Sequence, residues 1–259
     1  MIAFPTAGTG DPIQVRLAPL HAVRYALQAS HPIADKEVTG HIYADSFFPI
    51  GSITGSRGTL QLPPGAYMLW VEVEDTISTK QPFTVGASDI DLPLIVFQPS
   101  KMAIHFGHGT PRLSPMRDME NQPFEVPSLT GHWTLLYFWA DWCVPCIHES
   151  LPRLITFANQ NQSRRDQFRI IAIRESGKTE TSDWKSFHES TTRLEKELWH
   201  TVPPFPMIYD ESAKVIADWG VDSFPTYALI DPAGNLVADA DLDTLIARLK
   251  NQPTGSPQH

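Results

Sequence analysis

The two cysteines of this chain, Cys143 and Cys146, are the only ones among its 259 residues, and they stand three positions apart. They closely follow the apolar run "TLLYFWA" (134–140), which is typical of a buried strand and too short to cross a bilayer. Paired cysteines at this spacing occur in metal sites, in covalent haem attachment and in redox-active dithiols. Because no other cysteine is present, the fold itself must be held by packing instead of by a disulfide framework.

Two of these three chemistries are disfavoured by the neighbouring residues. Covalent haem attachment needs a histidine directly after the second cysteine, where this chain has Ile147. A structural zinc site needs four ligands, and the candidates to complete one are His105 and His108 of "HFGH". Histidines in a glycine-rich stretch are more often exposed than ligating, so no metal is expected, and a metal-transfer protein stays an alternative.

The dithiol hypothesis is favoured by the order of strand, cysteines and helix. The segment "CIHESLPRLITFANQ" (146–160) predicts a helix, whose unpaired first N–H groups and dipole would favour a thiolate at Cys143. Lowering a cysteine pKa from ~8.5 to ~7 raises the thiolate fraction at neutral pH from a few per cent to about half. Cys146 is then placed to attack a mixed disulfide and release the product.

Charge excludes several classes of partner. The formal charge is −9, and residues 1–100 hold 5 basic against 9 acidic side chains, so neither half of the chain is basic. Nucleic acid and anionic membrane surfaces are therefore not expected as partners. No apolar run approaches the ~18 residues of a membrane-spanning helix.

The first part of the chain predicts a small all-β sandwich domain over residues 1–98. Short strands are expected at "IQVRL", "EVTGHIY", "GTLQL", "PFTV" and "DLPLIVF". In "YMLWVEV" (67–73), strict alternation places Tyr67, Leu69, Val71 and Val73 on one face. Residues 99–112 are rich in Pro, Gly, Ser and Met without periodicity, which indicates a linker.

Beyond the linker, strands and helices alternate over residues 113–250, which predicts an α/β domain with a central mixed sheet flanked by helices. After the dithiol the expected elements are the strand "FRIIAIRE", a helix over 181–199, the strand "FPMIYD", a short helix in "ESAKVIADWG", the hairpin "TYALIDPAGNLVA" and the helix "DLDTLIARLK". Residues 251–259 are predicted to be a disordered tail.

Two segments of this second part resemble the thioredoxin-fold thiol–disulfide oxidoreductases of the TlpA/ResA-like branch. "FWADWCVPC" is similar to the active-site segment "FWA-x-WC-x-x-C", and "WGVDSFPTYALIDPAGNLV" is similar to "GV-x-x-x-PT-x-x-x-x-D-x-x-G". The segment "TLQLPPGAYMLWVEV" of the first part resembles carboxypeptidase-regulatory-like or prealbumin-like sandwiches. The first resemblance covers about residues 120 to 250.

The resemblance implies roles for particular residues. Cys143 would be the nucleophile and Cys146 the resolving cysteine, with Trp142 shielding the sulfur. Pro225 would follow a cis peptide bond, and Phe224 would pair with a substrate peptide as an added strand. Glu149 occupies the position of an active-site glutamate that influences the cysteine pKa values, although an ordinary solvated glutamate is the alternative.

The chain departs from the thioredoxin pattern at two positions. Tyr137 stands where thioredoxin has a buried aspartate that accepts a proton, and a tyrosine with a pKa of ~10 is a poor base at neutral pH. The proton would then leave through Glu149 or water. Pro152 follows Cys146 by six positions instead of the usual five, which puts the phase of the helix in question.

The sequence thus predicts a two-domain thiol–disulfide oxidoreductase, more a reductase than an oxidant, that acts on protein thiols and disulfides. It needs no cofactor beyond its dithiol, and it exchanges electrons with a membrane or soluble redox protein. An extracytoplasmic location is expected, with an export signal removed ahead of the first methionine; the cytoplasm is the alternative. A redox-regulated interaction module and a thiol peroxidase are the rival functions, the latter disfavoured because Ala140 replaces the Thr or Ser three positions before a peroxidatic cysteine.

Overall fold

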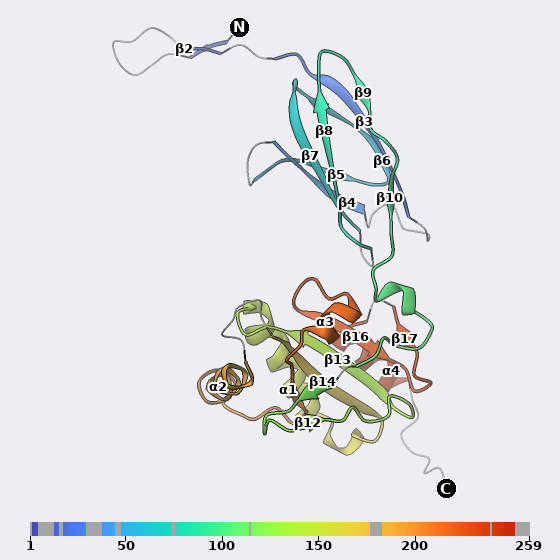
Figure 1. The fold of residues 1–259 in the computed structure, drawn as a ribbon, viewed down its shortest axis with the longest axis vertical. Helices are drawn as coiled ribbons and strands as arrows, with labels where there is room; N and C mark the ends of the chain where they lie inside the picture. The colour runs from blue at the N-terminus through green and yellow to red at the C-terminus, as the bar shows by residue number, and fades with distance from the viewer. Residues whose placement is uncertain are drawn as a thin grey trace. The chain divides into compact units, whose positions relative to one another are not determined.

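The chain divides into two compact units, Met1–Ser100 and Lys101–His259 (Figure 1). Each unit has a hydrophobic core of its own. The structure is a computed structural model, and it describes residues 2–4, 13–15, 18–29, 38–44, 48–73, 76–113, 115–176, 183–238 and 240–251. The predicted tail lies outside the described residues from position 252 onward, as does the start of the predicted helix at 181 and 182.

The first unit consists of strands in its described part, apart from turns and loops. They are β1 (Ile2–Phe4), β2 (Ile13–Val15), β3 (His21–Ala29), β4 (Val38–Tyr43), β5 (Pro49–Thr54), β6 (Arg57–Leu62), β7 (Gly65–Val73), β8 (Thr79–Val85), β9 (Ile90–Asp91) and β10 (Ile95–Phe97). One four-stranded sheet has the order β5-β4-β7-β8, and a second has the order β10-β3-β6 with β9 also paired to β3. β1 and β2 form a separate antiparallel pair.

The two four-stranded sheets of this unit enclose one shared core. Val23 of β3 and Phe97 of β10 are both fully buried in the same cluster as Leu69 and Val71 of β7. The predicted alternation along β7 is confirmed, because its odd-numbered residues from 67 to 73 are buried while Glu72 is exposed. Alternation places the apolar side chains of both sheets on their inner faces, and the packing of these side chains holds the two sheets together.

Three strands of the first unit, β1, β3 and β5, were not predicted. In β3, buried Val23, Tyr25 and Leu27 alternate with exposed or half-buried residues, so the signal was present in the sequence. β5 carries a single buried side chain, Ile53, and gives little signal. The predicted strand at 91–97 is split into β9 and β10, because Pro93 has no N–H to offer a ladder.

The second unit is a seven-stranded mixed sheet with the order β12-β11-β15-β14-β13-β16-β17. Its elements are β11 (Met116–Arg117), β12 (Pro123–Phe124), β13 (Trp133–Trp139), α1 (Leu151–Gln160), β14 (Phe168–Glu175), α2 (Trp184–Leu194), β15 (Met207–Asp210), α3 (Lys214–Trp219), β16 (Thr226–Ile230), β17 (Leu236–Val237) and α4 (Leu242–Lys250), with 3-10 turns at Ala103–His105 and Gln162–Arg164 and π-helical turns at Cys146–Ser150 and Glu195–Trp199. β13, β14 and β15 are parallel, and the neighbouring pairs are antiparallel. The predicted mixed sheet with flanking helices is confirmed.

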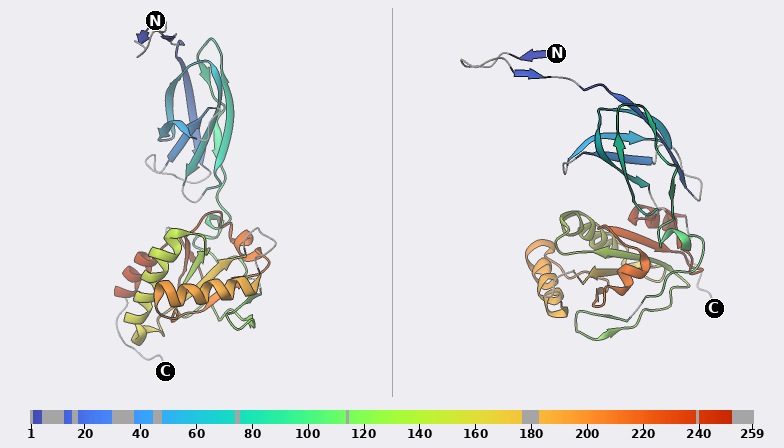
Figure 2. Two further views of the ribbon diagram at one scale, coloured as in Figure 1. Left: turned by 90° about the vertical axis from the view of Figure 1, so that its left-hand side faces the viewer. Right: turned by 45° about the horizontal axis from the view of Figure 1, so that its top comes forward.

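Helices cover both faces of this sheet (Figures 1 and 2). One face of β13 buries Leu135 and Tyr137 against α1, α2 and α4, and the other buries Leu136 and Phe138 against α3. All seven residues of β13 are buried, as expected for a central strand covered on two sides. No helix in the described part of the chain is long and apolar enough to cross a membrane.

The segment that the sequence assigned to a linker is largely part of the second unit. Met102 and Phe106 pack against the core on the α3 side of the sheet. Phe106 forms a bridge with Leu236, and the Gly107 N–H donates to the Leu236 carbonyl at 2.8 Å. Alternation is missing here because the segment follows the sheet edge through isolated bridges instead of a regular ladder.

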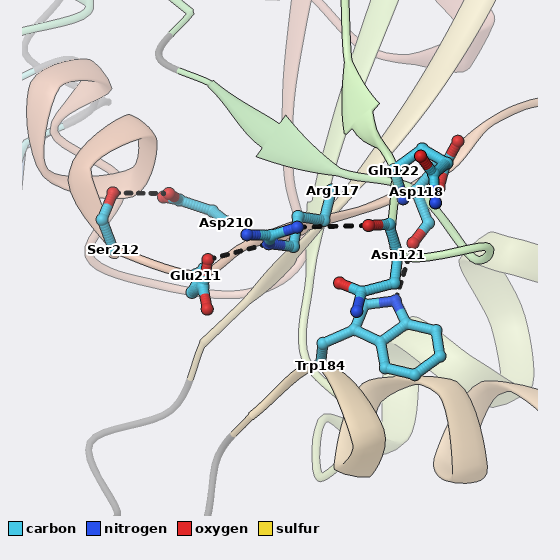
Figure 3. A network of polar contacts seen from close by, with 8 residues as sticks. All are labelled: Arg117, Asp118, Asn121, Gln122, Trp184, Asp210, Glu211 and Ser212. Atoms are coloured by element: carbon cyan, nitrogen blue, oxygen red, sulfur yellow. Dashed lines mark hydrogen bonds and ion pairs between the residues drawn. The ribbon is translucent and has the colours of Figure 1, made fainter.

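A polar network ties the hairpin of β11 and β12 to its neighbours (Figure 3). Arg117 Nε donates to Glu211 Oε2 at 3.0 Å, and Trp184 Nε1 of α2 donates to the Asp118 carbonyl at 2.8 Å. Asp118 itself accepts from the N–H groups of Glu120 and Gln122, which closes the turn between the two strands. Short strands with few ladder bonds are thereby fixed by side chains.

The carboxylate of Asp210 organises the start of α3. It is fully buried at the end of β15 and accepts from the Ile216 N–H at 3.0 Å. Burial raises the pKa of Asp210, and backbone hydrogen bonds only partly oppose this. A raised pKa in the folded state means that stability is highest below the unfolded-state pKa and is lost as pH rises through the folded pKa.

We therefore expect Asp210→Asn to gain stability relative to the natural protein as pH rises from about 4 to 7, because asparagine keeps an acceptor oxygen without the buried charge. Asp210→Ala should instead lose about 1–3 kcal/mol, since the α3 N–H groups lose a buried partner. Denaturant unfolding at several pH values measures both. Asp218→Ala, which removes a surface ion pair to Lys214, is the control and should change stability by less than about 1 kcal/mol. A pH-independent difference for the asparagine variant would contradict the prediction.

Candidate active site

Cys143 and Cys146 form a disulfide at the carboxyl end of β13. Their Cα atoms are 5.2 Å apart, and both residues are buried, Cys143 at 4% exposure and Cys146 at 0%. The flanking Trp142 and Val144 are 66% and 63% exposed. Cys143, the more accessible of the two cysteines, is therefore flanked along the chain by two exposed apolar side chains.

The backbone after Cys143 presents N–H groups to its sulfur. The Cys146 N–H donates to Cys143 Sγ at 3.3 Å, and the Ile147 N–H donates to the Cys143 carbonyl at 3.2 Å. A thiolate at Cys143 would accept the same N–H more strongly than a neutral sulfur does, because the acceptor is charged. The helix start thus favours ionisation of this cysteine over Cys146.

The helix after the dithiol begins with a π-helical turn at Cys146–Ser150, and α1 follows from Leu151. The Leu151 N–H donates to the Cys146 carbonyl, five residues back, where an α-helix would span four. The turn accommodates one extra residue ahead of Pro152, which matches the six-residue offset noted in the sequence. Pro152 is tolerated because it stands in the first turn of α1.

The hydroxyl groups of Tyr137, Tyr227 and Ser150 form a cluster next to the resolving cysteine. Tyr137 Oη donates to the Cys146 carbonyl at 3.3 Å, and its ring centroid is 5.0 Å from that of Tyr227. Burial raises the pKa of Tyr137 and of Tyr227, while hydrogen bonding to the Ser150 side chain partly opposes this. Both phenols therefore stay protonated at neutral pH, so they position the backbone and do not act as bases.

Trp142 and Phe224 lie together beside the disulfide. Their rings meet edge to face with centroids 5.8 Å apart. The Phe224–Pro225 peptide bond is cis, and β16 begins at the next residue. Because β16 runs antiparallel to β13, its first residues lie next to the end of β13 that carries the cysteines.

The remaining predicted residue, Glu149, lies on the exposed side of the π-turn together with His148. Among the described residues its carboxylate has no hydrogen bond or ion pair, so its influence on the thiols stays a prediction. His105 contacts the Gly109 carbonyl through Nδ1 at 2.8 Å, and His108 is exposed. Over the described ranges, no group of three or more His, Cys, Asp or Glu side chains is placed to hold a metal ion.

Sequence reasoning missed two contacts at this site. Asp141, two positions before Cys143, forms an ion pair with buried Arg174 at the end of β14. Trp199 Nε1 donates to the Ile147 carbonyl at 2.9 Å, and the Trp199 ring meets Trp139 edge to face. Arg174, a buried charge directly after the apolar run "IIAI" of β14, was a signal for the first contact, whereas the second joins segments 52 residues apart.

We expect Trp199→Phe to destabilise the protein by about 0.5–1.5 kcal/mol more than Trp133→Phe does. Both tryptophans are 9% exposed, but the Nε1 of Trp133 has no hydrogen-bond partner among the described residues. The pair of variants therefore separates the hydrogen bond to Ile147 from the loss of ring area. Thermal unfolding of the two variants makes the comparison, and equal losses would contradict a role for this bond.

The sequence of the second unit matches a known protein family. The AhpC/TSA family matches residues 107–239. The thiol:disulfide interchange protein DsbE of Xylella fastidiosa (strain 9a5c) is 28% identical over 140 residues, which are 50% of this chain and 62% of that protein. The thiol-disulfide oxidoreductase ResA of Bacillus anthracis is 27% identical over 120 residues, which are 46% of this chain and 61% of that protein.

Among solved structures, that of StoA from Bacillus subtilis is 20% identical and has a TM-score of 0.39, covering 49% of this chain and 86% of that one. The chain spans less than two thirds of the length of the two curated relatives named above. Its second unit has the thioredoxin-like fold that the sequence predicted. Because the matched segment is more than half of the 259 residues, the chain belongs to the AhpC/TSA family.

Proposed function

We propose that this protein is a thiol–disulfide oxidoreductase that exchanges disulfides with protein substrates. The observation that carries the proposal is the Cys143–Cys146 disulfide at a helix start, with the Cys146 N–H directed at the Cys143 sulfur. That arrangement favours a thiolate at Cys143. The similarity to proteins named DsbE and ResA supports the same activity.

In the reducing direction, the Cys143 thiolate attacks one sulfur of a substrate disulfide. A mixed disulfide forms, and the other substrate sulfur leaves as a thiolate that takes up a proton. Cys146 then loses its proton and attacks the Cys143 sulfur, which releases the second substrate sulfur and leaves the Cys143–Cys146 disulfide. Two electrons have passed to the substrate, so the dithiol needs no further cofactor, and a redox partner protein returns the electrons by the reverse exchange.

The exposed aromatic surface beside the dithiol is proposed to receive the substrate peptide. Exposed Trp142 and half-buried Phe224 lie in contact there, and the backbone of Phe224, ahead of the cis peptide bond, would pair with the substrate as an added strand. Large aromatic side chains contribute much of the contact area in peptide recognition. Glu149 at the rim would modulate the thiols through its charge.

The finer assignment rests on the sequence motifs. We infer a member of the TlpA/ResA-like branch that acts as a reductase and meets a membrane or soluble partner outside the cytoplasm. The first unit would be a carboxypeptidase-regulatory-like or prealbumin-like sandwich. Fractionation of the source cells checks the location, and recovery in the cytosolic fraction would contradict it.

Replacing Cys143 by serine should abolish thiol-dependent reduction of a disulfide-bonded peptide, because no nucleophile remains. Replacing Cys146 by serine should instead trap the mixed disulfide, since nothing resolves it. Turnover assays and mass spectrometry of the Cys146→Ser protein with substrate measure the two effects. Asp218→Ala, far along the chain and at the surface, should keep full turnover.

These variants also separate the rival functions. A natural protein without thiol-dependent turnover would favour a redox-regulated interaction module. Peroxide consumption that requires Cys143 but not Cys146, in the absence of peptide reduction, would favour a thiol peroxidase. Either result would overturn the oxidoreductase proposal.

The reduction potential of the Cys143–Cys146 pair should lie nearer that of thioredoxin, about −270 mV, than that of strong oxidants, about −120 mV. This range corresponds to about 7 kcal/mol of redox preference, since ~30 mV equals 1.4 kcal/mol for two electrons. Equilibration of the purified protein with dithiothreitol or glutathione gives the value. A potential near −120 mV would make the protein a disulfide donor and remove the reductase assignment.

A further inference from the structure

A buried charge lies at the base of the loop that carries the dithiol. Arg174, the seventh residue of β14, pairs in register with Trp139 at the end of β13. Its side chain is only 6% exposed, and it reaches past the end of β13 to form an ion pair with Asp141. Asp141 is itself 25% exposed and stands two residues before Cys143.

Among the described residues, the Asp141 carboxylate is the hydrogen-bond partner of the Arg174 guanidinium. Its Nε and Nη1 atoms are buried without a hydrogen-bond partner among the described residues, so Nη2 makes the recorded bond to Asp141. The guanidinium lies over the Phe187 and Tyr209 rings at 5.9 and 6.0 Å from their centroids, and these rings stack on each other. Aromatic faces attract a cation, so Phe187 of α2 and Tyr209 of β15 help to hold Arg174 in place.

The ion pair lies close to the reactive sulfur along the chain. Consecutive Cα atoms are 3.8 Å apart, so the Cα atoms of Asp141 and Cys143 lie within about 8 Å of each other. Two unit charges about 8 Å apart interact by roughly 0.5–2 kcal/mol at effective dielectric constants between 80 and 20. A bare carboxylate at Asp141 would therefore disfavour a thiolate at Cys143, and a neutralised one would not.

We propose that Arg174 is a positioning residue for the dithiol, which fixes Asp141 and neutralises its charge so that the Cys143 thiolate forms beside a closed ion pair. The proposal rests on the proposed function, because it concerns the same dithiol. It goes further in assigning to Arg174 and Asp141 opposite effects on the balance between disulfide and dithiol. A purely structural pair would have no such opposite effects.

The reaction that reports this balance is exchange with glutathione. Two glutathione thiols reduce the Cys143–Cys146 disulfide, which yields the protein dithiol and one glutathione disulfide, and two electrons pass to the protein. A group that stabilises the thiolate shifts this equilibrium toward the dithiol. Arg174→Met should shift it toward the disulfide by about fivefold, and Asp141→Asn should shift it toward the dithiol by a similar factor.

The experiment measures this equilibrium constant at pH 7 in the full-length protein for Arg174→Met, Asp141→Asn and the double variant. The double variant should return to within about twofold of the natural protein, because neither charge remains. Arg174→Lys keeps the charge and should also stay within about twofold. Arg117→Met and Glu211→Gln, which break an exposed ion pair of the same unit, are the controls and should leave the constant unchanged.

Shifts of the same sign for Arg174→Met and Asp141→Asn, or no shift in either, would overturn the proposal. If Arg174→Met does not fold, as judged by its thermal unfolding, the sign of the Asp141→Asn shift decides. Failure of the proposed function is distinguishable, because the glutathione equilibrium needs no peptide substrate. Opposite shifts without peptide turnover would keep this inference and reject the oxidoreductase proposal, and turnover without the shifts would do the reverse.

Discussion

The complete burial of β13 is the constraint on which the site depends. All seven residues, Trp133–Trp139, are buried between two layers of helices, so the direction and the end point of this strand are fixed. The dithiol begins four residues after the end of this strand. The parallel partner β14 brings its last residues to the same end, and the antiparallel partner β16 brings its first. One strand therefore gathers three segments that are far apart in the sequence.

Local geometry then distinguishes the two cysteines from each other. The sulfur of Cys143 faces the Cys146 N–H at the helix start, whereas Cys146 lies fully buried above the hydroxyl of Tyr137. A thiolate is therefore stabilised at Cys143. Tyr137, next to Cys146, stays protonated and cannot take the proton of that cysteine. The π-helical turn keeps the Cys146 carbonyl bonded both to Leu151 and to Tyr137, which holds the resolving cysteine in place.

The first unit has a separate hydrophobic core, built by alternation along paired strands instead of by helices on a sheet. Its strands β3 and β7 contribute Val23 and Leu69 to the same cluster although they belong to different sheets. Segment 101–112 belongs to the second unit, because Phe106 packs against the α3 side of its sheet. The composition of this segment indicated a linker, since bridges at a sheet edge require neither alternation nor a long apolar run.

Local patterns in the sequence determined which segments follow one another around the dithiol: a buried run, two cysteines, a helix and a proline before the last hairpin. These features rest on periodicity and on side-chain chemistry within a few residues, so no partner needed to be known. Tertiary structure alone decided which distant groups meet them. The ion pair of Asp141 with Arg174 and the bond from Trp199 to Ile147 join residues 33 and 52 positions apart. Such contacts depend on the register of neighbouring strands and on the packing of α2, which long-range burial sets and local sequence does not encode.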